Sequence, residues 1–177
     1  MTDPAPLPGP ITGEELASLL AGSPPLVEGL SEPRVQVTPN GVDLTAAEVA
    51  WFSDDLPGRL DFDNSGRRLP ESEVIPWREG RLVLPPGAYL VRYTEKVNLP
   101  RDVLALGRPR SSLLRCGAHL GSAVWDAGYS GRGQGLLAVF NPAGLELAER
   151  ARVLQLLFFR LKGETAGYRG GYQGEGD

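Results

Sequence analysis

The dominant pattern along the chain is a series of short apolar runs separated by glycine and proline. In RLVLPPGAYLVRY, two β-rich runs flank a Pro-Pro-Gly turn, and Tyr89, Val91 and Tyr93 take every second position of the later run. GLLAVFN and RVLQLLFF supply further runs. A period of two is typical of strands, and regularly spaced short strands with many turn residues are typical of barrels and sandwiches. We therefore expect an all-β fold over residues 22–161, with no second helix in that range.

A short helix is expected before these strands. Thr12 opens the sequence T-G-E-E, in which Glu15 takes the third helical position of a capping box. The apolar stripe of this helix consists of Leu16, Leu19 and Leu20. The helix should end at Gly22. Residues 1–10 are rich in proline and predict a flexible lead-in.

Two segments depart from the strand pattern. Residues 53–73 are polar and rich in turn residues, and they lack the regular D-x-D-x-D-G spacing of a calcium loop, so we expect a long hairpin or surface excursion. Residues 164–177 contain too few apolar side chains to fold alone. They are either a disordered tail or a glycine-rich lid that closes over an anion with a flat base. The β domain is then expected to occupy residues 11–163.

Composition removes several classes of chemistry. The chain has 177 residues, which predicts one domain, and its net charge of -4 gives no general affinity for nucleic acid or anionic lipid. His119 and Cys116 are the only histidine and cysteine, so one chain cannot assemble a zinc site of the His/Cys type, and His119 is expected to be structural or on the surface. No run of about 18 apolar residues is present, so we expect no membrane association and a cytoplasmic location.

The segment GRPRSSLLRCG, residues 107–117, gathers Arg108, Arg110 and Arg115 with two serines in an otherwise apolar region. Guanidinium groups bind phosphate oxygens in two-point contacts, and serine hydroxyls can complete the shell. The residues alone leave two interpretations open: a phosphate site and a solvated strand end.

The carboxylate of Asp126 stands shortly after, in VWDAGYSGRG. A carboxylate near clustered arginines stays ionised, and beside Mg²⁺-bound phosphates it can orient and deprotonate a water molecule. An aspartate before Ala-Gly is also common in turns. Taken alone, Asp126 fits the turn better.

Five segments together change that balance, because in this order they resemble the five motifs of the dUTPase and dCTP deaminase superfamily. They are NGVDLTA (40–46), PRSSLLRCG (109–117), AVWDAGYSG (123–131), ARVLQLLFF (151–159) and YRGGYQGEG (168–176). The resemblance implies a distorted β-barrel of the dUTPase-like, β-clip type, and a homotrimer whose sites are built from several subunits. It also implies that the C-terminal segment closes over a site, in its own subunit or in another.

The resemblance includes two activities, and one position separates them. Zinc-independent deaminases carry a glutamate three residues before an asparagine, and counting back from Asn141 gives Ala138. Residues 132–140 contain no acid at all, so no shift of the alignment restores one. The D-x-x-Y-x-G motif of dUTPases is present from Asp126 to Gly131, and the C-terminal segment is similar to the deaminase-like form. The chain thus resembles an archaeal, deaminase-like dUTPase, which converts dUTP to dUMP and pyrophosphate with Mg²⁺.

The resemblance implies a role for each matching residue. Asp126 would activate the water, Tyr129 would pack beneath the deoxyribose, and Asp43 would support the metal or the motif backbone, unless it is only a strand-end aspartate. Ser111 would also act in catalysis, near the α/β bridge where negative charge develops, and Gln155 would contact phosphate or the catalytic water. The remaining roles fall into three groups: phosphate contacts from Arg110, Ser111, Ser112, Arg115 and Gln155; uracil contacts from the backbone of Leu120, Gly121, Ser122, Ala123 and Val124; and a lid of Tyr168, Arg169, Tyr172 and Gln173. Arg152 is expected in a structural ion pair. Mg²⁺ would be held mainly by the triphosphate.

Three alternatives stay open at this point: a dCTP deaminase, a bifunctional deaminase-dUTPase, and a nucleotide-binding trimer without turnover.

Overall fold

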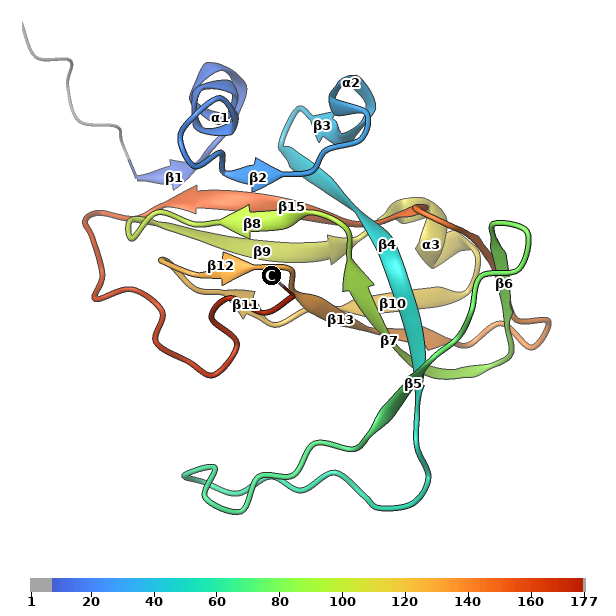
Figure 1. Ribbon diagram of the computed structural model, residues 1–177. Coiled ribbons are helices and arrows are strands. Elements are labelled where there is room, and N and C mark those ends of the chain that lie inside the picture. Colours follow the sequence, from blue (N-terminus) through green and yellow to red (C-terminus); the bar gives the residue numbers. More distant parts are fainter. Residues whose placement is uncertain (1–7, 177) are drawn as a thin grey trace, which may run out of the picture.

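A curled antiparallel sheet forms the body of the molecule in a computed structural model that describes residues 8–176 (Figure 1). Its seven central strands follow the order β10-β13-β7-β4-β15-β9-β11; β1 pairs with β15, and β3 and β5 pair with β4. Two small sheets, β12-β8-β2 and β14-β6, complete the fold. The strands are β1 Gly9–Pro10, β2 Val27–Glu28, β3 Val37–Thr38, β4 Gly41–Phe52, β5 Ser72–Val74, β6 Arg81–Leu84, β7 Gly87–Tyr93, β8 Lys96–Asn98, β9 Val103–Pro109, β10 Ala118–Gly121, β11 Val124–Trp125, β12 Ser130–Gly131, β13 Gln134–Val139, β14 Leu145–Ala148 and β15 Arg152–Arg160. The expected β-rich, barrel-like architecture is confirmed for the single chain.

Three short helices accompany the strands: α1 Gly13–Leu20, α2 Pro33–Gln36 and α3 Ser111–Arg115. The expectation of no helix after residue 22 is therefore wrong. Both α2 and α3 are about one turn long, and a single turn is too short to produce a recognisable helical period in the sequence. Figure 1 places α1 and α2 on one side of the sheet.

The N-terminal helix begins where expected, but the capping box does not form. Thr12 is the N-cap residue and makes no side-chain capping bond. Glu15 instead forms an ion pair with Arg160 on β15, whose Nη2 lies 2.8 Å from the Glu15 carboxylate. Of the expected flexible lead-in, residues 1–7 lie outside the described part of the chain, and Gly9–Pro10 pair with β15. At the helix, the ion pair between Glu15 and Arg160 has replaced the hydrogen bond expected within the capping box.

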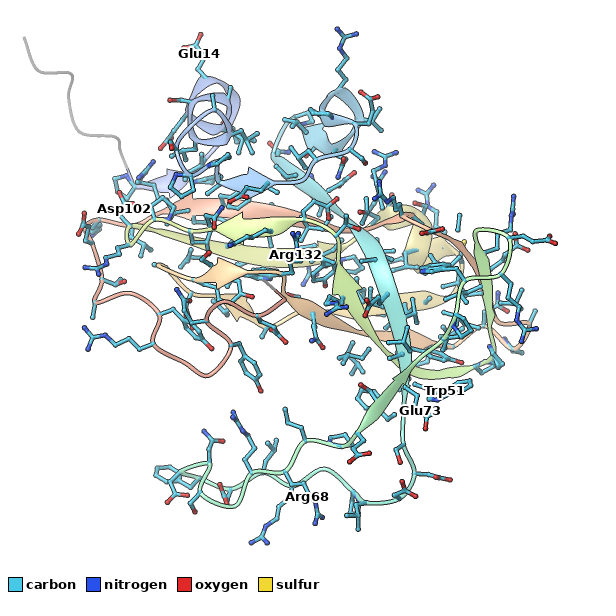
Figure 2. All side chains as sticks on the ribbon, viewed as in Figure 1. Glu14, Trp51, Arg68, Glu73, Asp102 and Arg132 are labelled. Atoms are coloured by element: carbon cyan, nitrogen blue, oxygen red, sulfur yellow. The ribbon has the colours of Figure 1, made fainter. Side chains whose placement is uncertain are left out.

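The long hairpin connection between β4 and β5, residues 53–71, projects from the sheet (Figures 1 and 2). We call this segment the arm. Trp51 and Glu73, opposite one another at its base, are joined by a 3.2 Å hydrogen bond from Trp51 Nε1. Further out, the backbones of Arg59 and Arg68 exchange two hydrogen bonds of 2.8 and 2.9 Å. The expected long hairpin is confirmed.

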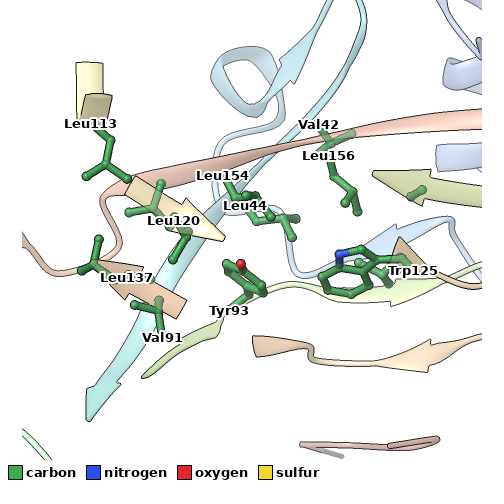
Figure 3. Close-up of a cluster of buried hydrophobic side chains, with 14 of the residues drawn as sticks. Val42, Leu44, Val91, Tyr93, Leu113, Leu120, Trp125, Leu137, Leu154 and Leu156 are labelled. Carbon is green, nitrogen blue, oxygen red and sulfur yellow. The ribbon is translucent and has the colours of Figure 1, made fainter. Parts of the chain in front are cut away.

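The core is one cluster of buried apolar side chains contributed by several strands of the curled sheet (Figure 3). Leu44 of β4 and Leu154 of β15 are direct partners across the ladder, and both are fully buried. Tyr93 and Trp125 pack with ring centroids 5.9 Å apart and join the β7 side of the core to β11. The alternating positions of the sequence therefore mark the inward faces of these strands.

A buried carboxylate, Glu95, fixes the start of β4. One Glu95 oxygen accepts hydrogen bonds from the Thr45 hydroxyl at 2.8 Å and from Gln36 Nε2 at 2.7 Å, and the other accepts the Thr45 backbone N–H at 2.8 Å. Gln36 also donates to the backbone oxygen of Asp43, at 3.1 Å. Since a buried charge must be well hydrogen-bonded to be tolerated, this network ties α2 to β4 and holds Asp43 in place.

Within residues 8–176, no helix is long and apolar enough to cross a membrane.

Candidate active site

A cavity of about 490 Å³ opens between the arm, the β11–β13 region and the C-terminal segment. Its lining combines aromatic and apolar side chains with a few polar ones, as is usual for small-molecule sites. The lining residues are Phe52, Leu69, Pro70, Ser72, Leu90, Ser122, Ala123, Val124, Trp125, Asp126, Tyr129, Gly133, Gln134, Tyr168, Tyr172 and Glu175. Five of the residues expected from the sequence to bind the base, sugar and water thus share one cavity with two residues of the expected lid.

The aspartate of VWDAGYSGRG sits on a turn at the wall of this cavity. The turn is closed by a 3.1 Å hydrogen bond from the Tyr129 N–H to the Asp126 carbonyl. Asp126 is exposed, whereas the Tyr129 ring is buried edge-on between Trp125 and Tyr168, with centroids 5.4 and 5.6 Å away. The turn interpretation of Asp126 is therefore confirmed, and the turn also presents its carboxylate beside a fixed aromatic ring at the cavity wall.

Gly128 is required at this turn for two reasons. Its φ of +84° lies in the left-handed region, where side chains are strained. A Cβ there would also lie 2.8 Å from Gly167 Cα and 3.0 Å from Tyr168 N, because the C-terminal segment passes directly over the turn. Gly128 is therefore a docking point of that segment.

The C-terminal segment is ordered and packs against its own chain. The Tyr168 N–H donates to the Ala127 carbonyl at 2.8 Å, and the Gly174 N–H donates to the Ser130 carbonyl at 2.8 Å. The Gln173 side chain accepts from the Ser130 N–H and donates to the Gly128 carbonyl, both at 3.2 Å. Between residues 164 and 176 the disordered-tail interpretation is therefore wrong; Asp177 lies outside the described residues.

Glu175 is a cavity residue that the sequence did not indicate. Its carboxylate accepts a 2.7 Å hydrogen bond from Gln134 Nε2 on β13, and its backbone oxygen accepts the Arg132 N–H at 2.7 Å. Burial raises the pKa of Glu175 above its ordinary value, while the charge of Arg92 and the Gln134 bond oppose the shift. No local pattern connects Glu175 to β13, since only the return of the chain brings the two together.

A second cluster lies around Asp43, whose side chain is buried between two arginines. Arg110 and Arg152 both form ion pairs with Asp43 Oδ2, the latter at 3.1 Å. Burial raises the pKa of the Asp43 carboxyl, and the two guanidinium groups oppose this shift. The ion pair expected for Arg152 is confirmed. Asp43 is engaged in orienting arginines rather than free to receive a cation.

The remaining phosphate candidates surround this cluster. Gln155 stands directly between Asp43 and Arg108 in the strand register, and its Nε2 donates to the Thr38 hydroxyl at 2.6 Å. On α3, Ser111, Ser112 and Arg115 are exposed. Neither the Asp43 cluster nor the phosphate candidates around it line the cavity that holds Asp126. In a single chain, the arginine-serine surface and the cavity are separate.

Four other expected residues, Gln173 among them, do not line the cavity either. Leu120 is fully buried in the core, and Gly121 pairs with Leu136 at the end of β10. Arg169 is exposed. His119 is exposed too, which confirms that it is a surface residue.

A protein-built metal cage is absent from residues 8–176, where no group of three or more His, Cys, Asp or Glu side chains could hold an ion. The donors that are present, guanidinium and hydroxyl groups around a neutralised aspartate, are suited to anions. They fit a cation that arrives already bound to phosphate oxygens.

The fold is a mostly β half-barrel that carries an arginine-serine surface and a glycine-rich segment beside a cavity lined by Asp126 and Glu175. The chain belongs to the dCTP deaminase-like family, whose model matches residues 11–161.

Relatives within the class are more specific. The chain is 47% identical over 167 residues to a probable deoxyuridine 5'-triphosphate nucleotidohydrolase of Methanococcoides burtonii, a match that covers 93% of this chain and 97% of the relative. A protein of the same name from Archaeoglobus fulgidus is 42% identical over 165 residues, with 93% and 96% covered.

Among solved structures, the 2'-deoxycytidine 5'-triphosphate deaminase of Agrobacterium tumefaciens superposes with a TM-score of 0.63 at 21% identity. That match covers 86% of this chain but only 48% of the deaminase, and it supports the fold alone.

Proposed function

We propose that this protein is a dUTP diphosphatase, which hydrolyses dUTP to dUMP and pyrophosphate. The observation that carries the proposal is the turn from Asp126 to Tyr129, which presents an exposed carboxylate and a fixed aromatic ring at the wall of a nucleotide-sized cavity. The full-length similarity to proteins named as dUTP nucleotidohydrolases supports it. The alternative of deamination is disfavoured because Ala138 lies where deaminases carry their glutamate.

In the proposed reaction, Asp126 accepts a proton from a water molecule as its oxygen attacks the α-phosphorus. The bond from that phosphorus to the bridging oxygen breaks, and pyrophosphate leaves. Holding water and phosphorus in line supplies much of the rate, because an ordinary aspartate is a weak base. The ring of Tyr129 packs beneath the deoxyribose, where a ribose 2′-hydroxyl would clash.

The base and the phosphates are held by different parts of the chain. Backbone groups around Ser122, Ala123 and Val124 pair with the uracil edge and reject cytosine, whose donor and acceptor pattern is reversed. Arg110, Ser111, Ser112, Arg115 and Gln155 bind the triphosphate, and Asp43 keeps Arg110 oriented. Mg²⁺, which the triphosphate itself would hold, supplies charge neutralisation at the phosphates when bound.

We infer that the complete site forms between copies of the chain, as the homotrimer implied by the family resemblance would allow. The separation of the arginine-serine surface from the cavity supports this inference. So does an exposed apolar pair beside the cavity: Leu106 of β9 and Val124 of β11 are direct partners and are 39% and 55% exposed. Apolar surface next to an incomplete site favours association with a second copy. Tyr168, Tyr172, Gln173 and Arg169 then act as a lid, and the cytoplasmic location stays a prediction.

A product assay tests the function. The purified protein is incubated with each deoxynucleoside triphosphate, with and without Mg²⁺, and products are separated by anion-exchange chromatography. We expect dUMP and pyrophosphate from dUTP only when Mg²⁺ is present, and no deaminated product from dCTP. Conversion of dCTP at a comparable rate would favour the deaminase, and tight dUTP binding without product would favour a non-catalytic trimer.

A further inference from the structure

The arm is held in shape by hydrogen bonds within itself. Its two sides are joined by the isolated Arg59–Arg68 bridge, and the Arg68 guanidinium donates to the Pro57 carbonyl at 3.1 and 3.3 Å. At the tip, Asp61 accepts the Gly66 N–H at 2.6 Å and Asp63 accepts the Ser65 N–H at 3.0 Å. A ribbon with this many internal bonds can act as a fixed wall.

The base of the arm forms one side of the cavity, and the C-terminal segment forms part of the opposite side. Phe52, Leu69 and Pro70 contribute apolar surface from the arm side, while Tyr168 and Tyr172 contribute rings from the C-terminal segment. Both elements lie on the same side of the sheet in Figure 1. Asp126 stands on the cavity wall that connects them.

One contact joins the two sides directly. The guanidinium carbon of Arg67 lies 5.6 Å from the centroid of the Tyr172 ring, within the range of a cation–π interaction. The same guanidinium runs beside the neighbouring backbone, since a Cβ on Gly171 would lie 3.7 Å from Arg67 Nη2. Arg67 is exposed and Tyr172 is 39% exposed, so this contact is modest in strength and can open and close readily.

We propose that the arm is the second wall of the nucleotide cavity, and that Arg67 is a positioning residue that holds the C-terminal segment closed over a pyrimidine nucleotide by stacking on Tyr172. The identity of the ligand rests on the proposed function. The closure rests only on the contact between Arg67 and Tyr172. Arg67 acts through Tyr172 and takes no part in the chemistry.

Closure is measured first without nucleotide, by trypsin cleavage after Arg169, a site within the C-terminal segment. The fragment beginning at Gly170 is followed by mass spectrometry. In Arg67→Ala we expect cleavage to accelerate about two- to fivefold, the loss that corresponds to one exposed cation–π contact. Tyr172→Leu should produce a similar rise, and the double variant should be no faster than either single one. Arg78→Ala removes an exposed arginine that does not line the cavity and should leave the rate unchanged.

Turnover provides the second measurement. Arg67→Ala should raise KM for dUTP by a similar factor and leave kcat close to that of the wild type, because the contact contributes to binding of substrate and transition state alike. Arg67→Lys, which keeps the cation, should restore part of the loss. Unchanged cleavage in Arg67→Ala, or additive effects in the double variant, would overturn the proposal. If wild-type protein does not hydrolyse dUTP, the proposed function fails, whereas the cleavage experiment still decides the role of Arg67.

Discussion

Gln134 and Glu175 are 41 positions apart in the chain, yet the Gln134 amide donates a 2.7 Å hydrogen bond to the Glu175 carboxylate inside the cavity. This bond fastens the end of the C-terminal segment to β13. The adjacent backbone bond from the Arg132 N–H to the Glu175 carbonyl, at 2.7 Å, strengthens the attachment. The C-terminal segment has too few apolar side chains to fold alone, and its contacts with the rest of the chain hold it in place.

Docking of the C-terminal segment should depend on pH through Glu175. Burial raises the pKa of Glu175 from its ordinary value of 4.5, so the docked form binds a proton more tightly than the released form. Docking should therefore be strongest near and below pH 4.5 and weaken as the pH rises through the docked pKa. The measurement is hydrogen–deuterium exchange at Gly174, corrected for intrinsic rates, at about pH 5 and about pH 8.

The matched variants are Glu175→Gln, which should remove the pH dependence, and Glu164→Gln, an exposed position in the same segment, which should keep it. Equal protection of Gly174 at both pH values in the wild type would contradict the expectation.

Replacing Asp126 should abolish turnover and spare binding. Asp126→Asn keeps the shape and the turn but removes the proton acceptor, so we expect kcat for dUTP to fall about 10²- to 10⁴-fold. Affinity for dUTP, measured by calorimetry, should change little. Glu149→Gln, an exposed carboxylate outside the cavity, is the control. Near-normal turnover in Asp126→Asn would show that another group activates the water.

Asp43→Asn should destabilise the fold. It leaves Arg110 and Arg152 facing each other without the carboxylate that neutralises both. Because these guanidinium groups are partly exposed, we expect the free energy of unfolding to fall by about 1–3 kcal/mol, less than for a fully buried pair. Urea denaturation followed by tryptophan fluorescence measures it, with the exposed Asp55→Asn as the control. Equal stability of the two variants would mean that Asp43 has no structural role.

Gly128→Ala should release the C-terminal segment. The alanine requires a left-handed backbone at a cost of about 1–2 kcal/mol, and its Cβ collides with the backbone at Gly167. Trypsin cleavage after Arg169 should accelerate, and KM for dUTP should rise. Gly163→Ala is the matched control, since a Cβ there has no neighbour within 4 Å. A protected segment in Gly128→Ala would show that the turn and the segment are independent.

Mixed assemblies should reveal whether one site is shared between two copies. Asp126→Asn disables the cavity, and Arg115→Ala disables the arginine-serine surface. If these parts meet across an interface, mixing the two inactive variants at equal amounts should restore about a quarter of wild-type activity, because that fraction of sites combines two intact parts. No recovery after subunit exchange, monitored by native mass spectrometry, would indicate that each chain builds its own site.

The sequence by itself determined that the fold is rich in strands, several of the strands themselves, such as β7, β13 and β15, and the turn at Asp126. Tyr89, Val91 and Tyr93 alternate because neighbouring side chains of a strand point to opposite faces, and that property is local. The turn at Asp126 could likewise be anticipated, because glycine at Gly128 permits a backbone that other residues avoid. The two additional helices could not be anticipated, since four or five residues do not complete a helical period.

Only the tertiary structure decided what surrounds Asp126. Glu175 reaches Gln134, and Arg67 reaches Tyr172, because the chain returns after long intervals, and no local pattern encodes such a return. The capping box does not form for the same reason. Glu15 pairs with Arg160 of β15 and not with the backbone at the start of its own helix. The separation of Arg115 from the cavity is also a property of the folded sheet. Local periodicity specifies elements and turns, whereas packing specifies which distant side chains meet.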